Sequence, residues 1–435
     1  MPITETESGP SRRSSSARVL TVLADFPYPA TTGLHLRNLS NLELVHRLGC
    51  YSAVLYFTTE EREPVPVESA PLPRICDEVR HAGRRFPHAD FSTASLVLHK
   101  ADFLLRGALG WAGKRYPFSM SYDRIGAAEI ILTEAQRVKA DFVVLPSFML
   151  HYARNLTEHG FRVIADAIDV LTDLTSRFLA SYASHPVSRL ALYANYQASR
   201  AQERVFLPYC CEVWATSQAE AETLAKIAPT VNVVVVANSL DEDVFSPSPF
   251  TEGKSVGFIG TYSSRPNLDA ALFLAEQVFP AVLREHPDAR LKLAGANLPS
   301  ANEARLRELR YVDLLGAVAD SAELYNQCRV IALPVFVRGG VPLKIVEAMA
   351  REKAVVACPD LAAGLYVQDG YDLLVRDRAG FASAISLLLS DDDLCHCLAR
   401  NGRDTFLRNW SCSHAEEVLQ RSSVLTSCLS EEVRG

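Results

Sequence analysis

Two cations flank a glycine turn in the later half of the chain. Residues 330–336 are apolar and predict a buried strand, Gly339-Gly340 breaks the run, and Pro342 suits the first turn of a helix. A strand, a glycine turn and a helix in this order present free backbone N–H groups and the positive end of a helix dipole to an anion. Arg338 and Lys344 add two positive charges, so the stretch predicts an anion-binding turn.

Glu347 lies early in the helix that this turn would open. A carboxylate at that place reaches hydroxyl groups beyond a bound phosphate, which favours a pocket for a nucleotide diphosphate-sugar. The alternative is an ordinary connection between a strand and a helix, with Arg338 and Lys344 solvated, because glycine-rich turns that open helices are common.

The length of 435 residues predicts two domains. No run of about 18 uncharged apolar residues occurs, so the sequence predicts no transmembrane helix. Residues 1–17 are rich in serine and lack an apolar core segment, which is typical of a disordered leader and not of a secretory signal. We therefore expect a cytoplasmic protein.

Charge and cysteine usage argue against several classes of protein. The net charge of −7, with the acidic excess in residues 241–435, leaves no broad basic surface for a nucleic-acid partner. The ten cysteines are scattered, which favours reduced thiols over a disulfide framework. Cys395 and Cys397 flank a histidine, but positions two apart on a helix point in different directions, and we expect no metal there.

The first part of the chain predicts a parallel sheet with helices on both faces. Residues 76–140 have a mostly helical pattern with a mild basic bias, which favours solvated helix faces over a membrane-surface role because acids are interspersed. Short apolar runs predict the strands, at residues 19–24, 52–57, 142–146, 162–165, 212–215 and 231–236.

A second series of strands and helices follows residues 238–254, where Asp, Ser, Pro and Gly crowd together. We therefore predict an N-terminal domain over 18–240 and a C-terminal domain over 241–410, two α/β Rossmann-like domains that face each other across a cleft. In open parallel sheets the ligand lies beyond the carboxyl ends of the strands. The second series of strands is expected at residues 255–260, 291–294, 312–315, 330–335, 354–357 and 372–375.

With these motifs in place, the sequence resembles the retaining GT-B glycosyltransferases of the group 1 type, often called family 4. The opening loop Asp25–Pro29 with Gly33 and Arg37 is similar to the family's N-terminal loop. The stretch Val163–Asp169 is similar to its acidic loop, and Ala237–Asp241 to its hinge, with Ser239 in the place of glycine. Further matches lie at Gly257–Thr261 with Pro266-Asn267, at Pro359–Leu365, at Gly370 and at Trp410.

The resemblance implies a GT-B fold in which the C-terminal segment, residues 411–435, crosses back to the N-terminal domain. It implies transfer of a sugar from a UDP- or GDP-sugar to a small-molecule acceptor, with retention and with neither a metal nor another cofactor. At most peripheral membrane contact is expected, and a homodimer is allowed. A cell-envelope glycan as acceptor, an epimerase or phosphorylase of the same fold, and a non-catalytic sugar-nucleotide-binding subunit remain open alternatives.

This chain departs from the family's pattern at two places. The family often carries two glutamates eight residues apart, and this chain has Gly339 in the place of the first. No cation follows the first turn of the C-terminal domain before Arg265. A subgroup has an Arg-Gly turn and a helical lysine instead, which Arg338 and Lys344 match.

The predicted site has two sides. On the donor side, Arg338 and Lys344 neutralise the leaving diphosphate and Glu347 accepts from ribose. The remaining donor-binding residues are expected to be Gly33, Gly260, Thr261, Gly316, Gly339, Gly340 and Val341. On the acceptor side, His151, Asp166 and Asp169 follow predicted strands, and a structural role for the histidine is the alternative. The acidic clusters at 241–243 and 391–393 are expected to serve the hinge and a helix start, not a metal.

Overall fold

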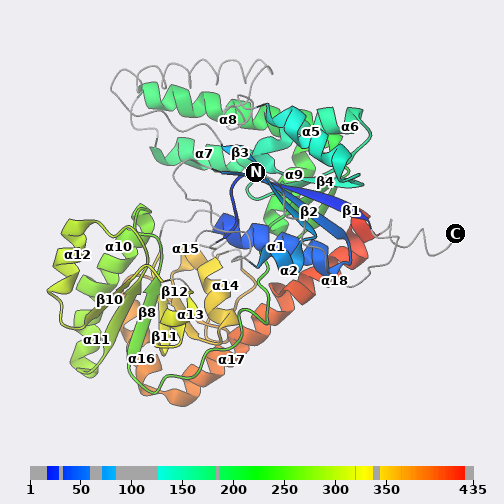
Figure 1. Cartoon of the computed structure of the whole chain (residues 1–435). Helices are drawn as coiled ribbons and strands as arrows, with labels where there is room; N and C mark the ends of the chain where they lie inside the picture. The colour runs from blue at the N-terminus through cyan, green and yellow to red at the C-terminus, as the bar shows by residue number, and fades with distance from the viewer. Residues whose placement is uncertain are drawn as a thin grey trace. The chain divides into compact units, whose positions relative to one another are not determined.

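The computed structural model describes residues 17–28, 33–58, 71–84, 126–182, 186–318, 320–336, 343–363 and 365–426. Two compact units are distinguished among them. The N-terminal unit holds the described residues up to Tyr28, those from Asn41 to Val235 and those from Glu416 onward. The C-terminal unit holds the described part of Pro29–Ser40 and of Val236–Ala415. Each unit contains one parallel sheet covered by helices (Figure 1).

The N-terminal sheet has seven described strands in the order β3-β2-β1-β4-β5-β6-β7, and every pair is parallel. Its strands are β1 (Arg18–Leu23), β2 (Tyr51–Thr58), β3 (Glu78–Arg84), β4 (Phe142–Pro146), β5 (Arg162–Ala167), β6 (Glu212–Ala215) and β7 (Asn232–Val235). Its helices are α2 (Leu72–Ile75), α5 (Ala127–Arg137), η2 (Ser147–Tyr152), α6 (Ala153–Glu158), α7 (Leu171–Tyr182), α8 (Pro186–Phe206), η3 (Leu207–Tyr209) and α9 (Gln218–Ile227).

The C-terminal sheet has six described strands in the order β10-β9-β8-β11-β12-β13, again all parallel. Its strands are β8 (Ser255–Ile259), β9 (Arg290–Ala294), β10 (Val312–Gly316), β11 (Val330–Leu333), β12 (Ala354–Ala357) and β13 (Leu374–Val375). Its helical segments are α10 (Arg265–Phe273), η4 (Leu274–Val278), α11 (Phe279–Glu285), α12 (Ser300–Arg307), α13 (Ala322–Tyr325), α14 (Leu343–Ala350), α15 (Pro359–Ala362), α16 (Phe381–Ser390) and α17 (Asp392–Asn409).

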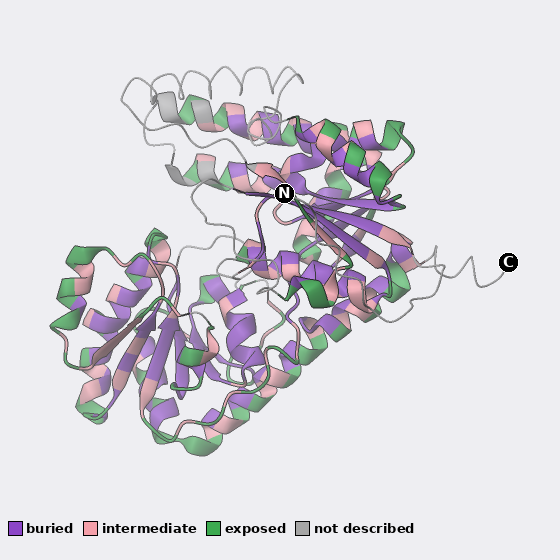
Figure 2. Cartoon of the chain, viewed as in Figure 1, coloured by how far each residue is buried: buried purple, intermediate pink, exposed green. Residues whose placement is uncertain are grey.

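Most strand residues in both sheets are buried (Figure 2), as expected for near-continuous apolar strands with helices on both faces. The polar segment Glu78–Arg84 is an exception that the sequence prediction missed. The sequence predicts a mostly helical segment over residues 76–140, but Glu78–Arg84 is strand β3, which among the described strands pairs with β2 alone, at the edge of the sheet. An edge strand has a hydrogen-bonded neighbouring strand on one side only and therefore tolerates charged residues. The helical expectation holds at α5, and residues 85–125 lie outside the described residues.

Two helices contribute to both units. The contact pattern assigns the start of α1 (Gly33–Arg47) to the C-terminal unit and its end to the N-terminal unit. It assigns the start of α18 (Cys412–Ser422) to the C-terminal unit, and its end to the N-terminal unit. There the buried carboxylate of Glu212 accepts hydrogen bonds from Ser423 Oγ at 2.6 Å and Val424 N at 2.9 Å. The predicted return of the C-terminal segment to the N-terminal domain is thus present.

The segment predicted as a hinge, residues 238–254, is held within the C-terminal unit by cations. Arg351 donates to Val244 O at 3.1 Å, Lys353 to Pro249 O at 2.6 Å and Arg403 to Phe245 O at 2.7 Å. Each charged group supplies donors to carbonyls that no strand or helix would satisfy. Glycine and proline make this segment irregular, and these three cations, of which Arg351 and Lys353 are buried, hold its backbone in one conformation.

No helix of the described residues combines the length and apolar character that a bilayer crossing requires. The nine cysteines of the described ranges form no disulfide. Cys395 is buried and Cys397 is exposed, so the two thiols do point apart.

Candidate functional site

Each sheet has one point at which its strand order reverses direction. This point lies between β1 and β4 in the N-terminal sheet and between β8 and β11 in the C-terminal sheet. Ligands of open parallel sheets bind beyond the carboxyl ends of the strands at such a point. In the C-terminal unit, the residues that follow β8 and open α14 lie there. In each unit, several of the residues predicted for the site lie at or close after these strand ends.

Three glycines line the carboxyl edge of neighbouring strands β8, β9 and β10. Gly295 has a φ of +144°, and a Cβ there would lie 2.0 Å from the carbonyl oxygen of Gly260. Gly295 N donates to Gly316 O at 2.7 Å, and Gly260 N donates to Ala294 O at 3.0 Å. Only glycine permits so close an approach. The predicted residues Gly260 and Gly316 thus shape this edge through their backbones.

Lys344 on α14 reaches the turn after β8. Its Nζ donates to Asn267 Oδ1 at 2.5 Å and lies 5.1 Å from the centre of the Phe258 ring. A Cβ at Gly260 would come within 2.6 Å of that Nζ, so the glycine leaves the space that the ammonium occupies. Asn267 Nδ2 donates in turn to Thr261 O at 2.9 Å. The amide is fixed at both ends and holds the ammonium at the turn.

Burial lowers the pKa of Lys344 to about 8, and the nearby carboxylate of Glu347 opposes that shift. An ammonium with so little water around it gains strongly from an anion brought beside it, because a desolvated charge interacts through a low dielectric. Lys344 is therefore suited to a phosphate group. The sequence predicts a role for the lysine, but it does not reveal that Asn267 is its hydrogen-bond partner.

Glu347 lies on the buried side of α14, with 9% of its surface exposed. Burial raises its pKa, while a hydrogen bond from Ser321 Oγ and the charge of Arg351 lower it. Ser321 donates to Oε1. A carboxylate oxygen accepts more than one hydrogen bond, so further hydroxyl donors are compatible with this arrangement. The sequence did not predict the contact with Ser321, which precedes α13.

Arg338, Gly339, Gly340 and Val341 lie outside the described residues, and their predicted roles stay predictions. Gly33 is the first residue of α1, and a Cβ there would lie 3.3 Å from Leu343 Cδ1. Leu343 opens α14 directly before Lys344. The described start of α1 thus joins the donor-side residues within the C-terminal unit.

The acceptor-side residues follow neighbouring strands of the N-terminal unit. Pro146 pairs with Asp166 across β4 and β5, so the segments after these strands leave the same edge of the sheet. His151 is in η2, with its ring centre 3.7 Å from that of Tyr152. Asp166 is buried and accepts from Asn41 Nδ2 at 3.0 Å, whereas Asp169 is half-buried in the loop after β5. The structure therefore places the three residues at one edge of the sheet, His151 in η2, Asp166 near the end of β5 and Asp169 in the loop that follows it.

The acidic clusters serve backbone groups. Asp241 accepts from the amides of Asp243 and Val244 at 2.9 and 3.3 Å, and Asp391 caps α17 by accepting from Leu394 N at 2.9 Å. The capping role predicted for residues 391–393 is confirmed at Asp391. Within the described ranges, no group of three or more His, Cys, Asp or Glu side chains is placed to hold a metal ion.

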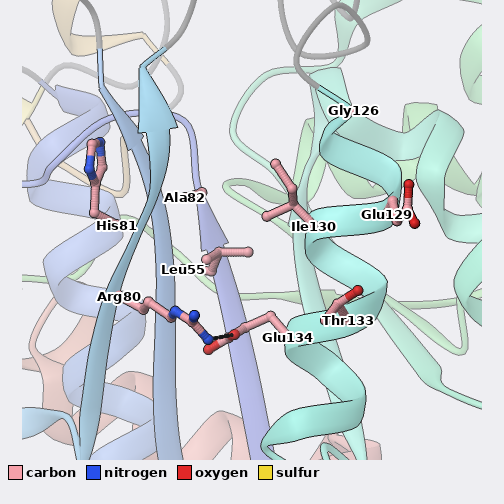
Figure 3. A pocket seen from close by; sticks show the side chains of 9 residues that line it. All are labelled: Leu55, Arg80, His81, Ala82, Gly126, Glu129, Ile130, Thr133 and Glu134. Atoms are coloured by element: carbon pink, nitrogen blue, oxygen red, sulfur yellow. Dashed lines mark hydrogen bonds and ion pairs between the residues drawn. The ribbon is translucent and has the colours of Figure 1, made fainter. Parts of the chain in front are cut away.

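A hollow of about 450 Å³ lies elsewhere in the N-terminal unit, between β3 and α5. Figure 3 shows Arg80 of β3 and Glu134 of α5 joined by an ion pair, with Ile130 facing the strands and His81 on the other side of β3. None of the predicted site residues lines this hollow.

Comparison with known proteins agrees with this geometry. Residues 253–391 match the family described as Glycosyl transferases group 1. This part of the chain is similar to the group 1 glycosyl transferases, and the protein is a glycosyltransferase. The match covers β8, the Gly260 turn, Lys344 and Glu347, so these predicted donor-side residues lie within the matched region, whereas Gly33 lies outside it. No curated protein sequence matches the chain.

Solved structures show that the fold of this glycosyltransferase is GT-B. Sucrose-phosphate synthase from Thermosynechococcus elongatus is 16% identical with a TM-score of 0.64, over 95% of this chain and 100% of that one. TarM from S. aureus, in a complex with UDP, is 10% identical with a TM-score of 0.64, over 94% and 100%. Anabaena HepE, in a complex with UDP and glucose, is 15% identical with a TM-score of 0.56, over 96% and 99%. The predicted GT-B fold and the predicted glycosyltransferase class are confirmed, and the likeness to group 1 enzymes is found over residues 253–391.

Proposed function

We propose that this glycosyltransferase moves a sugar from a UDP- or GDP-sugar to a small-molecule acceptor, with retention and without a metal ion. The observation that carries the proposal is the Lys344 ammonium, held by Asn267 at the glycine turn after β8. HepE and TarM, which share the fold, have been solved with UDP. A cation beside a glycine turn is the arrangement that a leaving diphosphate requires.

The C-terminal unit is the donor side in this proposal. The Lys344 ammonium neutralises charge that develops on the diphosphate as the glycosidic bond breaks. Arg338 supplies a second cation, and the amides of Gly339, Gly340 and Val341 donate to phosphate oxygens. Glu347 accepts from the ribose hydroxyls beside its bond from Ser321. Two cations and several amides supply the neutralisation that a metal provides in other transferases.

The N-terminal unit is the acceptor side. Asp169, half-buried after β5, orients the acceptor hydroxyl, and Asp166 and His151 shape the adjoining loops. Retention follows from attack on the face that the diphosphate leaves, with the leaving phosphate accepting the hydroxyl proton. This route requires no protein nucleophile, and positioning becomes the main task of the acceptor side.

A donor screen tests the proposal. Thermal shift with UDP, GDP, dTDP and ADP should stabilise the protein with UDP or GDP above the other two, since ligand binding stabilises by RT ln(1 + [L]/Kd). Nucleotide release from UDP-glucose, UDP-N-acetylglucosamine and GDP-mannose is then measured with glycerol, myo-inositol and glucose 6-phosphate. Release that depends on one of these acceptors supports the proposal.

Three other outcomes oppose it. Stabilisation by none of the nucleotides would remove the donor site. Nucleotide binding without release, with any acceptor, would favour the non-catalytic subunit. Release only with a glycan or lipid-linked acceptor would move the function to the cell envelope.

A further inference from the structure

Helix α7 begins directly after the loop that carries Asp169, and the side chain of its N-cap residue is apolar. Val170 O accepts from Leu174 N at 2.9 Å, which places Val170 at the N-cap position. A valine side chain has no acceptor for the free amides of the first turn. Helix starts that lack a capping side chain fray, and a frayed α7 would release the neighbouring loop.

The missing acceptor comes from another helix. Glu203 lies on α8, is 1% exposed, and accepts from Leu171 N at 2.6 Å and from Thr172 N at 3.1 Å. Thr172 Oγ1 donates to the same carboxylate. Three donors at the start of α7 thus converge on two carboxylate oxygens that lie 32 residues further along the chain. Figure 1 shows α7 and α8 alongside each other, as this bridge requires.

We propose that Glu203 is a positioning residue for the acceptor side, which holds the loop Ile168–Val170, and with it Asp169, by capping α7 from α8. The inference rests on the proposed function, because it assigns the loop an acceptor role. Leu171 is two residues from Asp169, so the carboxylate fixes the backbone immediately beside the proposed acceptor contact. Asp166, two residues before this loop in β5, accepts a hydrogen bond from Asn41 Nδ2 at 3.0 Å.

The charge of Glu203 has a physical cost. Burial raises its pKa to about 7, the three hydrogen bonds from α7 oppose that shift, and Asp173 on α7 adds to it. The other titratable groups with described side chains on the packed elements are Arg177 on α7, His151 and Tyr152 on η2, and Tyr209 on η3. Three hydrogen-bond donors hold the Glu203 carboxylate in a buried environment that disfavours its charge. We therefore infer a role for Glu203 beyond packing.

Glu203→Gln separates these roles. An amide has one acceptor oxygen, so its NH₂ group must face a donor at the start of α7. Hydrogen exchange of peptides covering residues 168–176 at pH 8 should show at least a tenfold loss of protection at Leu171 and Thr172. Glu203→Asp keeps the charge and both oxygens, and should retain more protection than Glu203→Gln. Glu222→Gln, on an exposed face of α9, is the matched control and should match the parent.

The kinetic arm uses UDP release from UDP-glucose with the small acceptors of the screen. Glu203→Gln should lower kcat/KM for the acceptor about tenfold or more, while the Kd of UDP stays within twofold of the parent. Unchanged exchange would overturn the cap. Loosened exchange with parental kcat/KM would overturn the positioning role. Hydrogen exchange tests whether Glu203 caps α7 even if the protein turns over no donor. Failure of the proposed function is therefore distinguishable from failure of this inference.

Discussion

Lys344 Nζ lies 2.5 Å from Asn267 Oδ1, although 77 residues separate the two along the chain. The amide accepts from the ammonium and donates to Thr261 O, so its orientation is fixed at both ends. Gly260 completes the arrangement, because any Cβ there would occupy the place of the ammonium. A mobile lysine is thereby converted into a cation at a defined point of the turn, which lowers the entropy lost when a diphosphate binds.

Removing the ammonium should reduce catalysis strongly. Lys344→Met should cost about 2–4 kcal/mol of transition-state stabilisation, by comparison with the loss of other preorganised charge-stabilising groups. Steady-state nucleotide release measures kcat/KM, and circular dichroism checks that the fold is kept. Lys292→Met, in the same unit, is the control, since Lys292 pairs with Asp313 away from the turn. Equal losses in both variants would refute a special role for Lys344.

The same lysine predicts a pH dependence of nucleotide binding. With a pKa of about 8, Lys344 is charged below that pH and becomes neutral above it. The Kd of UDP should therefore rise as the pH is raised through 8 in the parent protein. In Lys344→Met the Kd should already be high and should lack this rise. Isothermal titration calorimetry between pH 7 and pH 9.5 measures both, and a parallel rise in the variant would contradict the assignment.

Gly260→Ala tests the space around the ammonium. The added methyl group would meet Lys344 Nζ at 2.6 Å and Asn267 Cγ at 2.9 Å, so the lysine must move. We expect UDP affinity to fall about tenfold with a small change in melting temperature. Gly253→Ala is the matched control, because its Cβ would have only Thr251 Cγ2 nearby, at 4.0 Å. An unchanged Kd in Gly260→Ala would show that the displaced ammonium does not contact the nucleotide.

Glu347→Gln separates ribose recognition from packing. The amide keeps the shape but offers one acceptor oxygen, which Ser321 already uses. Donor affinity should fall about 10- to 150-fold, the effect of about 1.5–3 kcal/mol for one lost hydrogen bond to a charged group. Ser321→Ala should reduce donor affinity less than Glu347→Gln does, because the carboxylate of Glu347 remains and can still accept from ribose. Unchanged affinity in Glu347→Gln would make the residue structural.

Asp169→Asn tests the acceptor side. We expect kcat to fall at least tenfold while the Kd of UDP stays at the parental value, because the change lies in the acceptor loop. Asp173→Asn, on the first turn of α7, provides a matched loss of one negative charge nearby. Parental activity in Asp169→Asn would remove this side chain from the mechanism.

Glu203 predicts an effect of pH on stability whose sign is opposite to that of most carboxylates. Its pKa is raised from 4.5 to about 7 in the folded protein, so the native state binds more protons than the unfolded state between these values. The stability contributed by this group is present below pH 4.5 and is lost as the pH rises to about 7, by at most about 3 kcal/mol.

Glu203→Gln lacks this loss. The difference in melting temperature, variant minus parent, should therefore be more positive at pH 8 than at pH 5. Glu222→Gln should show no such difference. The same difference at both pH values for Glu203→Gln would place the titrating group elsewhere.

The sequence by itself determined the two series of parallel strands and the glycine turns between strands and helices. Buried parallel strands are nearly continuous apolar runs, and a turn at a strand end needs glycine for local steric reasons, so both features are visible in a few consecutive residues. Lys344, which indicated an anion, and Glu347, which indicated sugar hydroxyls, were also visible, because their spacing follows from one helix.

The tertiary structure alone decided the partners of these residues. Asn267 and Ser321, which hold Lys344 and Glu347, come from other loops of the C-terminal unit, and Glu203 reaches α7 from α8. Strand β3 forms because the edge of a sheet accepts its polar residues, which no local pattern reveals. Such contacts depend on which elements the sheet order places side by side, and that order results from packing of the whole unit.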